Sequence, residues 1–250
     1  MIIKVCGMRD GENIRQVTEL GVDWIGMIFW EKSPRNVTMI PTHAGIIPDR
    51  APQDHLQCTS VPSVNGDLKS PLKVGVFVDE MPQNIITRVF NYRLDLIQLH
   101  GHETPTMIRN LRSTLDPDIR PGIKIIKAIN VASRDDVATY KTYEDCVDYF
   151  LFDTKVSAAG HASRRDGSTT ATPGSTAHYG GSGIQFDWSV LDAYDGELPF
   201  LLSGGIGPDD AKRVSNYHHP KCIGIDLNSR FETEPGVKDV NKLKLFLEQL

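Results

Sequence analysis

The chain has 250 residues, of which 40% are hydrophobic and 24% are charged. These values are typical of a folded globular protein and exclude a disordered or fibrous chain. Its 27 Lys and Arg against 32 Asp and Glu give a net charge of −5, with no basic run to neutralise a series of phosphates, so we expect no nucleic-acid partner. No apolar stretch is long enough for a secretory signal or a membrane-spanning helix, which predicts a cytoplasmic protein.

Eight short apolar runs recur along the chain without polar alternation, which predicts fully buried strands. They begin at Ile2, Asp23, Lys73, Leu94, Ile123, Asp148, Leu198 and Cys222. Amphipathic segments with helix-starting residues lie between several of these runs, at residues 10–20, 82–91, 104–115 and 187–193. Eight successive βα units predict a (β/α)₈ barrel, formed by residues 1–250 as a single domain, with an open doubly wound sheet as the alternative.

Two of these units carry long excursions. Residues 47–72 contain several prolines, which forbid one long helix and predict a short helix followed by an irregular segment at the amino-terminal rim of the barrel. Residues 156–179 are rich in Gly, Ser, Thr and Ala and have no apolar period, so we expect a mobile loop. This second loop leaves the carboxyl end of strand six, where barrel enzymes keep their chemistry.

Two candidate catalytic residues stand at predicted strand ends. Cys6 closes strand one, where a ligand can reach it and where its thiolate can take a proton from carbon, although a lone cysteine is usually a small buried hydrophobe. Asp153 closes strand six and suits either a structural acceptor or a general acid. The remaining cysteines, Cys58, Cys146 and Cys222, are assigned to packing or solvent, since no CxxC pair indicates a zinc site or a disulfide scaffold.

Glycine-rich strand ends predict a phosphate site. Gly204 and Gly205 follow strand seven, and Asn228 and Ser229 follow strand eight, the two positions where such barrels bind phosphate. The glycines of residues 180–183, including Gly181 and Gly183, are either a third phosphate-facing stretch or the flexible end of the long loop.

Three further polar residues are predicted at the same rim. Arg35, in the loop after strand two, is either a solvated surface charge or a forked partner for a substrate carboxylate. Gln98 and His100 end strand four, as pocket residues or as a hydrogen-bonded strand cap. The histidines show no spacing of metal ligands, so we expect no metal.

Motifs at consecutive strand ends, spanning the chain in order, together resemble the phosphoribosylanthranilate isomerase family of tryptophan biosynthesis. They are Lys4–Met8, Lys32–Arg35, Val74–Phe77, Gln98–Gly101, Phe152–Thr154, Gly180–Gly183 with Phe186–Trp188, Ser203–Ile206, Gly224–Ser229 and Pro235–Asp239. The resemblance implies an Amadori rearrangement of N-(5′-phosphoribosyl)anthranilate to 1-(2-carboxyphenylamino)-1-deoxyribulose 5-phosphate, with no cofactor.

The same resemblance implies a role for each matched residue. Asp153 would be the acid that protonates the ribose ring oxygen, and Cys6 the base that takes the C2′ proton. Arg35 would hold the anthranilate carboxylate, and Asp226 would be the strand-eight acid lining the site. The phosphate loops would be Gly204, Gly205, Asn228 and Ser229.

Two other functions remain as alternatives at this point. One is another phosphate-binding barrel isomerase, against which Cys6 argues, because the related histidine-pathway isomerase carries an aspartate at that strand end. The other is a catalytically silent barrel that binds a sugar phosphate. Family members occur as monomers and as homodimers, so both states are open, and the two long excursions look like additions to the family pattern.

Overall fold

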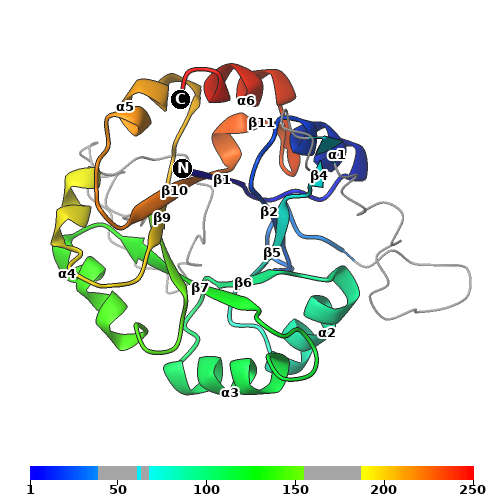
Figure 1. The fold of residues 1–250 in the computed structure, drawn as a ribbon, viewed down its shortest axis with the longest axis vertical. Coiled ribbons are helices and arrows are strands. Elements are labelled where there is room, and N and C mark those ends of the chain that lie inside the picture. The colour runs from blue at the N-terminus through cyan, green and yellow to red at the C-terminus, as the bar shows by residue number, and fades with distance from the viewer. Residues whose placement is uncertain (39–60, 63–67, 155–186) are drawn as a thin grey trace, which may run out of the picture.

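Eight parallel strands close into a barrel at the centre of the molecule (Figure 1). The computed structural model describes residues 1–38, 61–62, 68–154 and 187–250. In chain order the barrel strands are β1 (Ile2–Val5), β2 (Trp24–Ile28), β5 (Leu72–Phe77), β6 (Leu96–Leu99), β7 (Lys124–Val131), β8 (Tyr149–Thr154), β9 (Phe200–Leu202) and β10 (Cys222–Leu227). Because β1 pairs with both β2 and β10, the sheet has no edges, which confirms the barrel and excludes the open sheet.

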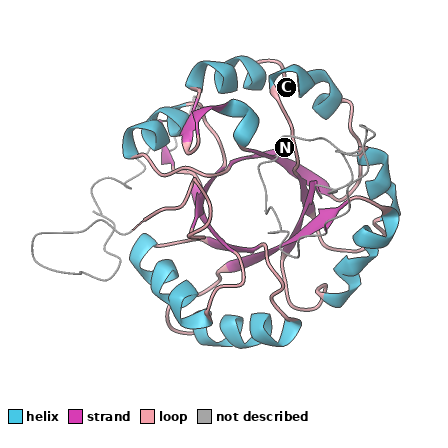
Figure 2. Cartoon of the chain, turned by 180° about the vertical axis from the view of Figure 1, so that it is seen from behind, coloured by secondary structure: helices cyan, strands magenta, loops and turns pink. Residues whose placement is uncertain are grey.

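Helices surround the strands as an outer layer (Figure 2). They are α1 (Gly11–Glu19), α2 (Pro82–Tyr92), α3 (Pro105–Leu115), α4 (Arg134–Val137), α5 (Ala211–Ser215) and α6 (Val240–Leu247). The predicted starts are confirmed: the Asp10 and Thr104 side chains accept hydrogen bonds from the backbone N–H groups of Asn13 and Met107, and proline stands at the start of α2 and α3.

One predicted helix has a different form. Residues Trp188–Ala193 are a 3₁₀ helix, not an α-helix, with Asp187 as its N-cap. The Val190 and Tyr194 N–H groups bond to carbonyls three residues back, at 3.1 and 2.9 Å, so the turn is tighter than an α-helical one.

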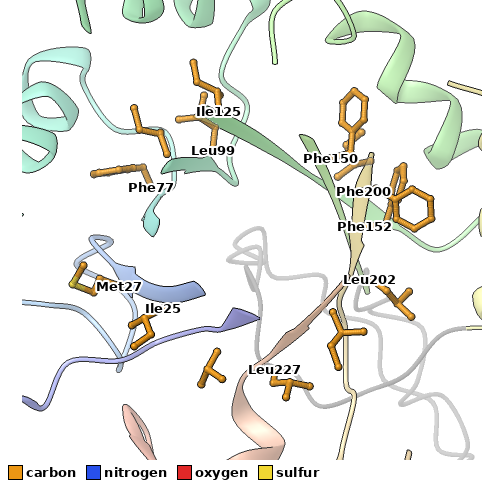
Figure 3. Close-up of a cluster of buried hydrophobic side chains, with 14 of the residues drawn as sticks. Ile25, Met27, Phe77, Leu99, Ile125, Phe150, Phe152, Phe200, Leu202 and Leu227 are labelled. Atoms are coloured by element: carbon orange, nitrogen blue, oxygen red, sulfur yellow. The ribbon is translucent and has the colours of Figure 1, made fainter. Parts of the chain in front are cut away.

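The hydrophobic core has two parts, which follow from the alternation of side chains along each strand. Residues on the outer face of the strands, among them Ile25, Phe77 and Phe152, pack towards the helices (Figure 3). Alternate residues fill the barrel interior as a second cluster, which comprises Trp24, Val74, Leu96, Ile126, Ala128, Leu151 and Leu201. Nearer the carboxyl ends of the strands the interior positions become polar, which places charged side chains at one mouth of the barrel.

Two antiparallel ladders lie outside the barrel. The strands β3 (Val61–Pro62) and β4 (Leu68–Lys69) pair with each other within the first excursion. The prediction of an irregular segment is therefore wrong for these residues, because their backbone groups form an antiparallel ladder. Residues 47–60 and 63–67 of that excursion, and with them the predicted short helix, lie outside the described residues, as does the whole 156–179 loop. After β10, β11 (Glu232–Glu234) pairs with β12 (Val237–Lys238) across a turn in which Gly236 has φ +91°. Within the described ranges, no helix is long and apolar enough to cross a membrane.

Candidate active site

A pocket opens at the carboxyl ends of the strands and encloses about 670 Å³, part of it open to solvent. Every predicted site residue that the structure describes lines it: Cys6, Arg35, Gln98, His100, Asp153, Gly204, Gly205, Asp226, Asn228 and Ser229. Gly181 and Gly183 lie outside the described residues. The barrel therefore gathers groups from six strands and their following loops into one concave site.

Cys6 is fixed at the bottom of this pocket by the end of β1. Its N–H donates to the Leu227 carbonyl at 2.8 Å, which continues the ladder between β1 and β10 by one residue. On the other side lies Gly26 of β2, where a Cβ would stand 2.8 Å from the Cys6 Sγ. Only glycine leaves room for the thiol there, and Cys6 is buried as a result.

Burial and the neighbouring cations shift the pKa of Cys6 in opposite directions. Burial raises the pKa of the Cys6 thiol above its ordinary value, because it disfavours the thiolate. Lys4 opposes this through its charge and a hydrogen bond to the thiol, Lys238 opposes it more weakly, and the Asp226 carboxylate adds to the rise. Cys6 is thus a strong base when ionised, with a nearby cation that favours ionisation.

Asp153 is the penultimate residue of β8, three strands round the barrel from β1, and is buried. Its Oδ1 lies 3.3 Å from the Ser203 hydroxyl and its Oδ2 lies 3.5 Å from the His100 Nε2. The same His100 nitrogen lies 3.3 Å from the Asn130 Oδ1. The carboxyl group is therefore held in place by polar side chains while facing the pocket, as a proton donor to a ligand must be.

Asp226 lines the pocket but its two oxygens already have protein partners. Lys4 Nζ donates to Oδ1 at 2.8 Å, and the Ser203 hydroxyl lies 3.4 Å from Oδ2. Ser203, on the loop after β9, thus stands between the Asp226 and Asp153 carboxylates and can donate to one of them at a time. In contrast, the buried Gln98 Oε1 has no hydrogen-bond partner within the described structure, so an acceptor is left for a ligand.

Arg35 reaches the pocket rim from the loop after β2. Gly7, with φ +67°, lets it approach, since a Cβ there would lie 2.7 Å from the Arg35 Cδ. Its Nε and Nη2 donate to the Glu232 carboxylate at 2.9 and 2.7 Å, in a forked pair. Glu232 also accepts from the buried Lys238 Nζ at 2.6 Å, and Lys238 donates to the Asn228 Oδ1 at 2.7 Å.

The contacts among Arg35, Glu232 and Lys238 also shift the pKa values of Glu232 and Lys238. Burial opposes ionisation of Glu232, but Arg35 and Lys238 outweigh it and hold the pKa of Glu232 below its ordinary value. Burial lowers the pKa of Lys238, although Glu232 offsets part of the effect. Of the two predictions for Arg35, the solvated surface charge is wrong, because the side chain is 12% exposed and paired.

The loops after β9 and β10 line a further part of the pocket. Gly204 and Gly205 have φ +94° and +69°, a conformation that glycine adopts without strain. Asn228 and Ser229 enter a 3₁₀ helix, Ser229–Phe231, next to them. Both loops therefore line the pocket, and the binding of phosphate by them stays a prediction.

The sequence interpretation gave no role to several residues of this site, among them Lys4, Gly26, Ser203, Glu232 and Lys238. Lys4 carried a signal, because it is a charged residue in the apolar run of residues 2–6. Glu232 and Lys238 flank a Pro-Gly turn, which a hairpin prediction could have used. Gly26 had no such signal, since its role depends on the neighbouring strand.

Comparison with known proteins identifies the family. The profile of "PRAI: N-(5'phosphoribosyl)anthranilate (PRA) isomerase" matches residues 3–249. The N-(5'-phosphoribosyl)anthranilate isomerase of Parabacteroides distasonis is 42% identical over 250 residues, which cover 100% of this chain and 93% of the relative. Phosphoribosyl anthranilate isomerase from Thermotoga maritima has a TM-score of 0.68 at 26% identity, with 100% of this chain and 98% of that chain covered. A phosphoribosyl anthranilate isomerase in complex with reduced 1-(o-carboxyphenylamino)-1-deoxyribulose 5-phosphate has a TM-score of 0.65 at 24% identity, with coverage of 100% and 98%. The chain belongs to the N-(5'-phosphoribosyl)anthranilate isomerase family.

Proposed function

We propose that this barrel catalyses the Amadori rearrangement of N-(5′-phosphoribosyl)anthranilate, with Asp153 as general acid and Cys6 as general base. The observation that carries this proposal is that one pocket holds both residues, together with Arg35 and the loops after β9 and β10. A substrate with one carboxylate and one phosphate needs an acid, a base and two anion sites, and the pocket offers candidates for all four.

The reaction follows from these positions. Asp153 donates its proton to the furanose ring oxygen, the C1′–O bond breaks, and the nitrogen lone pair forms a C1′=N iminium. The Cys6 thiolate then takes the C2′ proton, and the C2′–H electrons form the C1′=C2′ double bond of an enolamine. Tautomerisation moves the enol proton to C1′ and leaves the C2′ ketone, so the product is an isomer of the substrate.

The rest of the pocket orients the substrate. Ile28, Trp30, Val76 and Val78 line the pocket from β2, β5 and the loops after them, and they suit the anthranilate ring, while the Arg35 guanidinium suits its carboxylate. Gly204, Gly205, Asn228 and Ser229 suit the phosphate. The unpartnered Gln98 Oε1 suits a sugar hydroxyl, because an amide oxygen accepts a hydrogen bond.

The proposal extends to domain organisation, cellular location and assembly. Residues 1–250 act as one domain, in keeping with the single closed barrel. The enzyme works in the cytoplasm, and it works as a monomer or homodimer without needing a partner protein for its small-molecule substrate.

The test is the loss of fluorescent phosphoribosylanthranilate, generated in place, on adding wild-type protein, Cys6→Ala or Asp153→Asn. Wild type should turn over, and each variant should fall by roughly 10²–10⁴-fold, the contribution of one acid or base. Wild-type protein that binds a product analogue but does not convert phosphoribosylanthranilate would contradict the proposal.

A further inference from the structure

A buried lysine stands on the interior face of β1, where barrels usually place Val, Ile or Leu. Lys4 is 0% exposed, and its Nζ donates to the Asp226 Oδ1 at 2.8 Å. A buried ion pair of this kind seldom stabilises a fold more than apolar side chains of the same volume would. The stability of the fold is therefore not a sufficient reason for this ion pair. Its position next to Cys6 points to a role in the site.

Lys4 and Cys6 are two residues apart on one strand, so their side chains leave the same face. The ammonium interacts with the thiol through charge and a hydrogen bond, and this interaction, with that of Asp226, raises the pKa of Lys4 despite its burial. The thiol lies over Gly26 of β2, where an added Cβ would stand 2.8 Å from its Sγ. Lys4 is thus the cation that Cys6 meets at the base of the pocket.

We propose that Lys4 is a positioning residue for the rearrangement: its buried ammonium, anchored by Asp226, stabilises the Cys6 thiolate and so increases the fraction of Cys6 that is in its active form. This inference rests on the proposed function, in which Cys6 is the base. Lys4 acts through Cys6, because it does not itself line the pocket.

Charged and titratable groups on other elements also face Cys6. Asp226 from β10 and Lys238 from β12 act on the thiol directly, and across the pocket lie Arg35, His100 and Asp153. Lys238 cannot replace Lys4, because its ammonium is committed to Glu232 and Asn228, and its influence on Cys6 is weaker.

A second buried ion pair provides a matched control. Lys127 pairs with Glu103 at 3.1 Å and donates to the Gly101 carbonyl at 2.7 Å, so it secures the loop after β6. It does not line the pocket. Lys127→Met removes a buried ammonium as Lys4→Met does, without removing a charge from Cys6.

The experiment measures Cys6 ionisation without substrate. Iodoacetamide labelling of the Cys6 peptide is followed by mass spectrometry across a pH series, in wild type, Lys4→Met and Lys127→Met, and kcat and KM are measured over the same pH range. Lys4→Met should move the labelling midpoint and the acid limb of kcat/KM to higher pH together. Its kcat should fall about tenfold for each pKa unit at neutral pH and recover at high pH, with little change in KM. Lys127→Met should leave the labelling midpoint in place.

Should Lys4→Met fold poorly, the double variant Lys4→Met with Asp226→Asn leaves no buried charge unpaired. The double variant should shift the labelling midpoint of Cys6 in the same direction as Lys4→Met but by a smaller amount, because the effect of Lys4 on the thiol exceeds that of Asp226. An unchanged midpoint in either folded variant, or a loss of activity equal at every pH, overturns the proposal. A shifted midpoint in protein that never turns over substrate supports the effect of Lys4 on the thiol and overturns the proposed reaction instead.

Discussion

The guanidinium of Arg35 is held by the carboxylate of Glu232, with Nε 2.9 Å from Oε1 and Nη2 2.7 Å from Oε2. Glu232 in turn is fixed by Lys238 and by the Gly236 N–H at 3.2 Å. The arginine proposed to bind the substrate carboxylate is therefore oriented before the substrate arrives, which lowers the entropic cost of binding.

Arg35→Lys should raise KM by roughly tenfold while kcat changes less, because a lysine ammonium cannot hold Glu232 in a fork and also bind a carboxylate. Steady-state kinetics at saturating and limiting substrate check this. Arg9→Lys is the control, since Arg9 donates to the Pro34 carbonyl and does not line the pocket. An unchanged KM in Arg35→Lys would contradict the assigned role.

Cys6→Asp should keep part of the activity and shift the acid limb of kcat/KM to lower pH. Burial raises the pKa of the Cys6 thiol, so in wild type kcat/KM rises with pH as the raised pKa is approached. A carboxylate at the same position ionises at far lower pH and remains a base. A pH series of kcat/KM for both proteins checks this. Cys6→Ser, which offers no base in that range, should fall to the level of Cys6→Ala.

Gly26→Ala should lower kcat/KM, because the added methyl group would stand 2.8 Å from the Cys6 Sγ and 3.0 Å from its Cα. The thiol or its strand must then move, and a small displacement of a base costs rate steeply. Gly75→Ala is a comparison from β5, the strand that pairs with β2, where the new Cβ meets Leu94 and Phe77 in the outer core instead. Gly75→Ala should lower the midpoint of chemical denaturation, while activity per folded molecule stays near wild type. Equal activity losses in the two variants would count against the thiol contact.

Asp148→Asn should destabilise the protein by about 1–3 kcal/mol at neutral pH, the cost of removing one partner from a half-buried charged network. Asp148 accepts from Arg112 at 2.7 Å and from the Ile125 N–H at 2.8 Å, joining α3 and β7 to the start of β8. Burial opposes its charge, but Arg112, Ile125 and Lys124 together hold the pKa of Asp148 below its ordinary value of 3.8.

The pH dependence of this effect follows from the direction of that shift. A lowered pKa in the folded protein stabilises it above pH 3.8, and this stabilisation disappears as pH falls through the lowered pKa. In urea denaturation, the free energies of unfolding of wild type and Asp148→Asn should therefore differ at neutral pH and become similar in acid. Asp145→Asn, which breaks the exposed pair with Arg109, should change little at either pH. A difference that persists unchanged in acid would refute this explanation.

Much of the fold was predictable because it depends on local patterns. The strand starts at Ile2 and Cys222 and the helix starts at Asp10 and Thr104 are read from apolar runs and capping residues, and the structure confirms them. The 3₁₀ form of Trp188–Ala193 was not predictable, since the same capping pattern begins either kind of helix.

The site was predictable as a set of positions. Strand ends in a parallel barrel meet at one face, so Cys6 and Asp153 had to approach the same mouth once the eight strands were recognised. Nothing in their local sequence indicated that Gly26 would stand against the thiol, or that Asp226 would have both oxygens engaged.

The sequence by itself determined the order of the strands, the barrel class and the candidate acid, base and anion sites, because each depends on residues that are neighbours along the chain. Only the tertiary structure decided the partners of the buried charges. Lys4 meets Asp226 across 222 positions and Arg35 meets Glu232 across 197, because closing the barrel brings β1 against β10 and the loop after β2 against β11. Strand register then selects which side chains face one another, and that register is set by packing of the whole barrel.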